Sequence, residues 1–394
     1  MNWLHRAGAI LLVAASGHAL AWDRNNWPTR ITFKDGTELA ASLSFQYDAN
    51  RFSNDTLPDG SHRFEDDEGL RRREFGFSVR KRGVWDAGAV YDFQAEQFLD
   101  VYARVQTKAL FGQDFGALRV GQSKTPVGFE GVTSSRATSF LETALPTQAI
   151  HANRRIGIDW ALERRHWIIN LGYYDGDLAG DNDGPTTGGR VAWTPIKAEG
   201  NVLHLGVAAS RESPQRTTNG RGQPVVPAAR FRARPEAGLT DVRLVDSGAL
   251  TRADDIDRVG LEALWIAGPW SVQGEYLSAR ASREADLPAF RAEGFYVFGS
   301  WVVTGESRPY SNGNSGNLKP KGRYGAVELL LRYSELDLDD GVIRGGHGRN
   351  WTLGLNWYLD THFKIQANLV HARSDRNGLA LDPRIAQARF QVIF

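Results

Sequence analysis

The sequence contains no cysteine and only one methionine. Without cysteine, neither a disulfide framework nor a thiolate zinc site can form. No apolar run approaches the roughly twenty residues that a membrane-spanning helix needs. Leu-rich amphipathic stretches, which favour packed helices, are also scarce. These absences exclude helical membrane proteins and small disulfide-rich scaffolds.

The sequence also lacks the short motifs of common catalytic and nucleotide-binding sites. It has no G-x-S-x-G, no H-E-x-x-H and no P-loop. The acidic stretch 175–184 resembles half of a calcium loop, but no glutamate stands at its twelfth position. We therefore expect no catalytic residue, no bound metal and no cofactor. A barrel hydrolase stays open as an alternative from a different class.

The first 21 residues have the order of a secretory signal. Arg6 precedes the apolar run 7–15, and Ala19-Leu20-Ala21 offers small residues for cleavage. The apolar run is too short to cross a bilayer as a helix; the alternative is a buried N-terminal helix. We expect residues 1–21 to be removed, which leaves 22–394 as a single exported domain.

Alternation between apolar and polar residues is the pattern that the sequence has in abundance. From residue 39, segments of about ten residues alternate and then break at turn residues, as membrane β-strands do. In the last segment, Ala388, Phe390 and Val392 share one face, whereas Gln387 and Arg389 share the other. A soluble β-sandwich also alternates, but it would have to bury such charged residues. A water-filled lumen removes that cost.

Sixteen such segments can be counted. An even number of antiparallel strands can close into a barrel that leaves no exposed edge. We therefore predict an all-β protein, a closed transmembrane barrel of sixteen antiparallel strands. The expected strands are 39–49, 70–81, 84–93, 98–108, 115–124, 155–164, 166–175, 187–197, 201–211, 257–267, 269–281, 292–303, 324–336, 348–359, 362–374 and 386–394.

The connection 304–323 is unusually long for its position. Both ends of an even barrel lie on the periplasmic side, so long external loops should alternate with short periplasmic turns. Segment 304–323 falls on the periplasmic side, and its basic residues outnumber its single acid, Glu306. A long structureless loop in a compact domain is usually functional. The alternative is a strand hidden within it.

Three arginines alternate along the sequence ARFRAR at positions 230, 232 and 234. In an extended segment, alternate residues point the same way, so their guanidinium groups would form a row. The planar fork of arginine suits phosphate oxygens. Along a lumen, such a row would pass an anion between several moderate sites. On an external loop, it would meet only solvent or lipopolysaccharide phosphates, and the sequence leaves both interpretations open.

Several motifs resemble the phosphate-selective porin family of porins O and P. They are 71–77 (RRREFGF), 121–130 (GQSKTPVGFE), 304–310 (TGESRPY) with 319–321 (KPK), 325–329 (GAVEL), 332–338 (RYSELDL) and 350–359 (NWTLGLNWYL). The resemblance covers most of the mature chain and is most specific in its last third. It implies a homotrimeric outer-membrane porin, a passive channel for small anions such as phosphate or polyphosphate. Its partners would be outer-membrane lipid and lipopolysaccharide, not nucleic acid.

The same resemblance implies a set of pore-lining residues. Porins of this family pass anions along an arginine ladder to a lysine-containing constriction, narrowed by the third and fifth external loops and an inward-folded periplasmic segment. The matching ladder residues are Arg71, Arg72, Arg230, Arg232, Arg234 and Arg243, and the matching constriction residues are Lys124, Lys319, Lys321 and Arg323. Four acids also face inward on the predicted strands: Asp100, Glu262, Glu275 and Glu328. They keep a general or weakly selective porin open as the alternative.

We predict that the mature protein begins at Trp22, because the small residues before it complete the cleavage site. N-terminal sequencing of protein extracted from the membrane fraction tests this expectation. Retention of Met1 in that fraction would contradict it.

Overall fold

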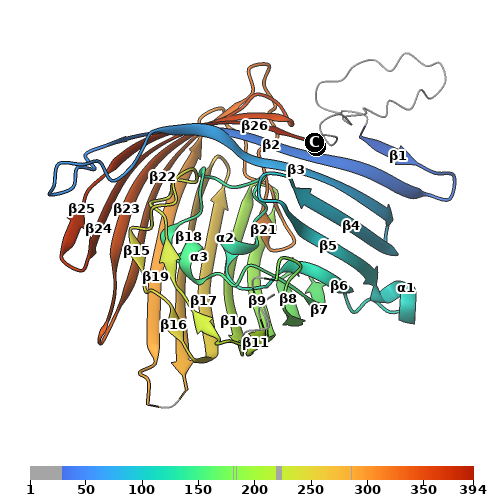
Figure 1. The fold of residues 1–394 in the computed structure, drawn as a ribbon. Coiled ribbons are helices and arrows are strands. Elements are labelled where there is room, and N and C mark those ends of the chain that lie inside the picture. The colour runs from blue at the N-terminus through green and yellow to red at the C-terminus, as the bar shows by residue number, and fades with distance from the viewer. Residues whose placement is uncertain (1–28, 181, 183, 219–223, 285) are drawn as a thin grey trace, which may run out of the picture.

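The computed structural model describes residues 29–394 except 181, 183, 219–223 and 285, so the expected cleavage site lies outside the described residues. Sixteen long strands each pair antiparallel with the next, and β2 closes the ring by pairing with β26 (Figure 1). The predicted closed sixteen-stranded barrel is therefore confirmed. Its strands are β2 (Thr37–Ser53), β3 (Asp67–Lys81), β4 (Trp85–Asp92), β5 (Gln97–Gln106), β6 (Ala117–Lys124), β7 (Arg154–Glu163), β8 (Trp167–Asp175), β9 (Pro185–Ala198), β10 (Asn201–Glu212), β17 (Ala253–Ala267), β18 (Trp270–Arg283), β19 (Phe290–Val302), β22 (Ala326–Asp340), β23 (Ile343–Tyr358), β24 (Phe363–Arg376) and β26 (Arg384–Ile393).

Short strands and helices lie beside the sixteen long strands or in the connections between them. Strand β1 (Arg30–Thr32) pairs with β2, and β25 (Leu379–Leu381) pairs with β24. The connections hold β11 (Thr217–Thr218), β12 (Pro224–Val225), β13 (Ala228–Ala229), β14 (Arg232–Ala233), β15 (Val245–Asp246), β16 (Leu250–Thr251), β20 (Tyr310–Ser311), β21 (Asn314–Ser315), α1 (Thr107–Phe111), α2 (Phe129–Val132) and α3 (Leu145–Ile150). In the described part of the chain, no helix combines the length and the apolar character needed to cross a membrane.

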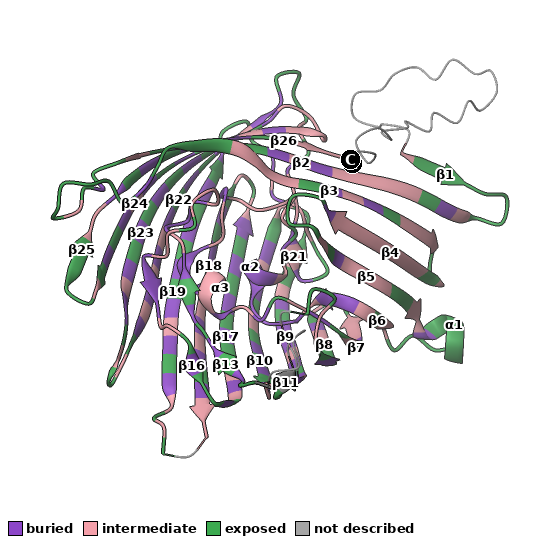
Figure 2. Cartoon of the chain, viewed as in Figure 1, coloured by how far each residue is buried: buried purple, intermediate pink, exposed green. Residues whose placement is uncertain are grey.

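The barrel wall is apolar outside and polar inside, the reverse of a soluble protein. On β23, Trp351 and Leu353 point outward and are 52% and 53% exposed, whereas the inward Thr352 and Asn356 are fully buried. Figure 2 shows this alternation of buried and exposed residues along β17, β19 and β23. Exposed leucine and tryptophan on every second position suit contact with lipid, because water would penalise so large an apolar surface.

Aromatic residues mark both ends of the outer apolar band. Near the end that holds Phe394 and the start of β2, which we call the terminal side, Trp270 and Trp301 stack with ring centroids 5.1 Å apart. Toward the opposite end, which we call the loop side, the rings of Tyr333 and Trp351 lie 4.9 Å apart. Rings with an apolar body and a polar tip favour the two membrane–water boundaries.

Two long connections start from the loop side, namely 125–153 between β6 and β7 and 213–252 between β10 and β17. Described parts of both fold into the barrel. Leu145 and Ile150 of α3 join Phe231 and Val245 of the second connection in one buried apolar cluster against the wall. The inward residues of β18 that they cover, such as Leu277, are themselves apolar. Inward apolar residues on the wall therefore mark where the loops pack.

A buried ion pair fixes the 213–252 connection to the wall. Glu236 of that connection accepts a hydrogen bond of 2.5 Å from Arg332 of β22, and both residues are at most 1% exposed. Glu236 also accepts bonds from Ser334 and Thr352. The guanidinium of Arg332 lies 4.2 Å from the ring centroid of Phe140, in the 125–153 connection. One arginine therefore holds both connections in place.

The expected strand ends differ most at 337–347, which the alternation assigns to a loop. In the structure, β22 and β23 continue through this segment and meet at a turn of two residues, 341–342. Asp337 pairs with His347 and Asp340 with Ile343. Beyond the membrane boundary both faces of a strand can meet water, so the apolar–polar alternation that identified the strands no longer applies there.

We expect Arg332→Leu to loosen both inward connections, because it leaves the carboxylate of Glu236 buried without its partner. Breaking one side of a buried ion pair costs about 3–5 kcal/mol. Limited proteolysis within 213–252 should accelerate, while Arg349→Leu, on the exposed outer face of β23, serves as the control. Equal protease resistance in both variants would contradict this role.

Candidate anion-conducting site

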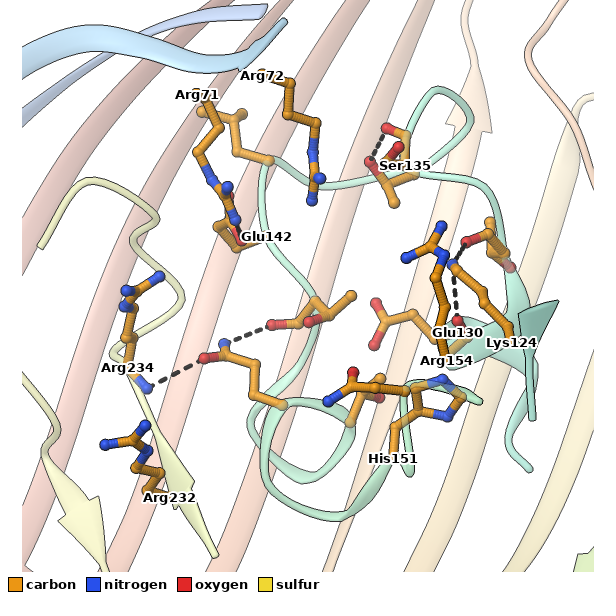
Figure 3. A pocket seen from close by; sticks show the side chains of 18 of the residues that line it. Arg71, Arg72, Lys124, Glu130, Ser135, Glu142, His151, Arg154, Arg232 and Arg234 are labelled. Atoms are coloured by element: carbon orange, nitrogen blue, oxygen red, sulfur yellow. Dashed lines mark hydrogen bonds and ion pairs between the residues drawn. The ribbon is translucent and has the colours of Figure 1, made fainter. Parts of the chain in front are cut away.

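A basic site inside the barrel is a cavity of about 440 Å³ between the inward connections and the wall. Its lining contains only two carboxylates, those of Glu130 and Glu142. Figure 3 shows arginines of β3 and of the 213–252 connection facing residues of the 125–153 connection across this space. The basic residues of the lining are Arg71, Arg72, Lys124, Arg154, Arg232, Arg234, Arg243 and Arg389. Such a lining favours an anionic occupant.

Apolar residues and arginines alternate along 229–234, and this alternation decides which way the arginines point. Ala229, Phe231 and Ala233 are at most 3% exposed and pack in the apolar cluster against the wall. The intervening arginines therefore point the other way. Two of them line the cavity, Arg232 and Arg234, and both are labelled in Figure 3. Arg230 does not line it, since Asp246 binds its guanidinium through two contacts.

Among the cavity-lining arginines of this connection, two lack an acidic partner. Arg232 and Arg243 form no ion pair with any residue that the structure describes, whereas Arg234 pairs with Asp241 at 2.8 Å. Nη1 of Arg243 and Nε of Arg234 are buried with no hydrogen-bond partner. Burial, and next the charges of Arg234 and Arg232, lower the pKa of Arg243 to about 10. It still carries its charge at neutral pH, and a bound anion would relieve the repulsion.

The two arginines from β3 differ in how strongly they are paired. Nε and Nη2 of Arg71 donate to the carboxylate of Glu142 at 2.7 and 3.0 Å. Burial alone would raise the pKa of Glu142, but Arg71 and then Arg389 outweigh it and hold this pKa at about 2. Arg72 has longer contacts, 3.5 Å to Glu74 and 3.9 Å to Asp92. Arg72 is therefore freer to meet a solute.

Lys124 lies where two cavities meet. It ends β6, and its Nζ donates to the carbonyl oxygens of Gly131 and Thr133 in the 125–153 connection. It lines the 440 Å³ cavity and also a second cavity of about 350 Å³. Among the described residues that line these two cavities, Lys124 is the one common to both. Burial, and next the charge of Lys124, lower the pKa of neighbouring His151 to about 3, so His151 adds no charge at neutral pH.

The second cavity is closed partly by the segment between β19 and β22. This segment, 303–325, turns inward and forms the hairpin of β20 and β21, with Asn312 and Gly313 at its tip, both at positive φ. Asn-Gly is the preferred pair for such a turn. Asn312 and Asn314 line the second cavity, and Asn314 accepts a hydrogen bond of 2.7 Å from Thr133. The inward fold that the family resemblance implies is therefore present in the structure, and the described segment holds no further barrel strand.

The basic residues of that segment lie elsewhere. Lys319, Lys321 and Arg323 are exposed and line neither of these cavities. The physical reason is Leu318, which is 2% exposed and packs with Val302 and other wall residues. Beyond this anchor, the chain turns back toward β22.

The four inward acids act as anchors rather than as free negative charges. Asp100 pairs with Arg154 at 2.9 Å, and Glu328 with Arg308 at 2.6 Å. Nε of Arg190 donates to Glu262 at 2.7 Å. Glu275 accepts hydrogen bonds from the backbone N–H groups at the start of α2. Their presence therefore does not make the lumen acidic.

Sequence reasoning missed two basic residues of the cavity, Arg154 and Arg389. The alternation in the last predicted strand places Arg389 on the polar face, and this position was a signal that it faces the lumen. Arg154 stands one residue before a predicted strand, where parity gives no direction. The structure adds that Asp48 lies directly opposite Arg389 across the β2–β26 seam and binds it at 2.6 Å.

Comparison with known proteins places the chain in a family. The model of the family described as "Phosphate-selective porin O and P" matches residues 40–394. An uncharacterized protein of Caulobacter vibrioides is 26% identical over 326 residues, which cover 76% of this chain and 64% of that protein. Porin O of Pseudomonas aeruginosa is 29% identical over 235 residues, which cover 50% of each chain. The matched regions thus span less than two thirds of either relative.

Solved porins share the fold at low sequence identity. An anion-selective porin from Comamonas acidovorans is 14% identical with a TM-score of 0.54, and the match covers 91% of this chain and all of that one. OmpT of Vibrio cholerae is 10% identical with a TM-score of 0.58, covering 92% of this chain and all of that one. These structures agree with the barrel architecture. Because the family model covers nearly all of the described residues, the chain belongs to the phosphate-selective porin O and P family.

Proposed function

We propose that this protein is a passive outer-membrane channel for small anions, with phosphate or polyphosphate as the favoured solute. The observation that carries the proposal is the cavity in which Arg232 and Arg243 have no acidic partner among the described residues. Arg232 is exposed, but Arg243 is half-buried, and a half-buried cation without a counter-ion is costly. The site therefore gains from an anion that enters it. Family membership supports the same conclusion.

In this proposal the arginines and Lys124 act in succession. Arg232 and Arg243 would draw an anion in from the loop side, and Arg72 would receive it near β3. Lys124 would then pass it to the second cavity. The compact ammonium of lysine suits a point where the ion must be released, whereas a bidentate arginine fork holds phosphate more tightly. Conduction therefore relies on several moderate sites.

The alternative is a general or weakly selective porin. The many paired acids and bases in the lumen support it, since only a minority of the basic groups is left unpaired. Phosphate selectivity is favoured because the unpaired groups are forked donors gathered around one cavity. No step of this mechanism requires a catalytic group.

We further propose export through a signal cleaved after Ala21 and assembly as a homotrimer surrounded by lipid and lipopolysaccharide. The outer face of β4 and β5 supports the trimer, because its residues Ala87, Ala89 and Ala103 are small and allow close approach of a second wall. A solved OmpT of Vibrio cholerae is described as a trimer form. Cross-linking in native membranes tests this assembly.

Replacing Arg232 and Arg243 together with alanine should weaken phosphate block of chloride current. Loss of one charge-assisted hydrogen bond weakens binding about tenfold, so the concentration for half-block should rise by at least that factor. Arg230→Ala is the matched control, because Asp246 already neutralises that arginine. Planar-bilayer recordings give both values. An unchanged half-block concentration in the double variant would assign these arginines to a solvated loop.

Shortening the inward hairpin should raise single-channel conductance. Residues 311–314 are replaced by Gly-Gly, which joins the paired residues Tyr310 and Ser315 by a two-residue turn and keeps the anchor at Leu318. The change removes Asn312 and Asn314 from the second cavity, so the passage should widen. Lys321→Glu, on the exposed part of the segment, is the control. If conductance stays at its original value, the hairpin does not limit the passage.

A further inference from the structure

An apolar groove runs along the outer face of β17, β18 and β19, which lie side by side in Figure 1. Its loop-side part, of about 580 Å³, is lined by outward residues that include Leu261, Tyr276 and Phe295. Its terminal-side part, of about 450 Å³, extends to Trp301 and shares Val272 with the loop-side part. The two parts therefore form one continuous groove through the lipid-facing band.

Small residues make the floor of this groove. Ala263 and Gly274 lie opposite each other on β17 and β18, and Gly299 lies opposite Val272 on β19. A Cβ atom added at Gly299 would meet no atom within 4 Å. The neighbouring positions carry large side chains. The small residues in the floor therefore leave room for an apolar ligand with the shape of an extended chain.

Charged residues stand at the loop-side end of the same groove. Arg280 of β18 and Arg291 of β19 are directly opposite each other on the outer face, and both are exposed. Like charges in this register repel each other. Arg291 pairs with Glu293 at 2.9 Å, and Tyr276, at the groove rim, donates to Glu293 at 2.9 Å.

Arg280 has no comparable partner. Its neighbour across β17 is Asp257, but Arg211 already binds both oxygens of that carboxylate, at 2.6 and 2.9 Å. Arg280 forms no ion pair with any described residue. An anionic group placed between Arg280 and Arg291 would remove their repulsion and supply the missing partner.

We propose that this outer face binds one phosphorylated lipid of the surrounding membrane, with a phosphate between Arg280 and Arg291 and an acyl chain in the groove. The aromatic row of Tyr276, Phe295 and Tyr333 lies on the terminal side of the two arginines, at the level of a membrane–water boundary. Phosphate groups of lipids lie at that level, and their chains run into the apolar band. The ligand's two chemical parts thus match the two parts of the site.

A lipid fits this face better than a second copy of the chain. A wall that packed here would need a protruding ridge to fill the groove, and it would have to bury Arg280 against a carboxylate of its own. A lipid supplies both an adaptable chain and a doubly charged phosphate. The site depends on the membrane location of the barrel but not on anion conduction, so failure of one proposal leaves the other standing.

Native mass spectrometry of the purified oligomer tests the proposal, with lipid A, an acylated disaccharide bisphosphate, as the probe. Loss of one charge-assisted contact weakens binding about tenfold, and we expect this from Arg280→Gln. Gly299→Leu should weaken binding similarly by filling the groove. Arg384→Gln, an exposed outward arginine on β26, should bind like the original protein. Single-channel conductance should be unchanged in all three variants, which shows that each barrel has folded.

Three results would overturn the site. Retention of the original affinity in both Arg280→Gln and Gly299→Leu would place the lipid elsewhere. Displacement of lipid A by millimolar inorganic phosphate would make the arginine pair an ion site rather than a headgroup site. Absence of lipid A together with dissociation of the oligomer in Gly299→Leu would show that a second copy covers the groove.

Discussion

Burial of charge inside the barrel is the constraint on which the rest of the structure depends. A wall that is apolar outside must direct its polar residues inward, and two long connections then fill much of that interior. Each buried charge therefore needs a partner. Arg332 and Glu236 meet this need across the lumen, and by doing so they fix the connections that carry the cavity. The ion pair that holds the loops against the wall therefore also positions the site.

The charged residues of the lumen differ in whether they are paired. Ion pairs or backbone hydrogen bonds already engage Glu262, Glu275 and Glu328. By contrast, Arg232 and Arg243 have no acidic partner among the described residues, although they lie in the same lumen. A charge that the fold leaves unpaired is available to a solute. In the proposed function, this arrangement would give an anion a path without making the interior as a whole strongly basic.

Sequence reasoning could predict the strands and the side of the barrel on which segment 304–323 lies, because both follow from local alternation and from counting. The inward fold of that segment followed only from the family resemblance. It could also anticipate that Arg232 and Arg234 share a side, since their apolar neighbours Phe231 and Ala233 occupy the other. The ion pairs between side chains could not be predicted from alternation or counting. Arg71 and Glu142 are distant in the sequence, and whether they meet depends on how a loop folds in three dimensions. The position of Lys321 likewise depends on Leu318, whose anchoring contact is tertiary.

The central claim is that unpaired basic groups make this lumen selective for anions. The reversal potential of the purified protein in a planar bilayer, measured across a gradient of potassium chloride, tests it most directly. We predict a reversal potential of the sign set by chloride, which moves toward zero in the double variant of Arg232 and Arg243. A reversal potential near zero, or one of the sign set by potassium, in the unaltered protein would contradict the account.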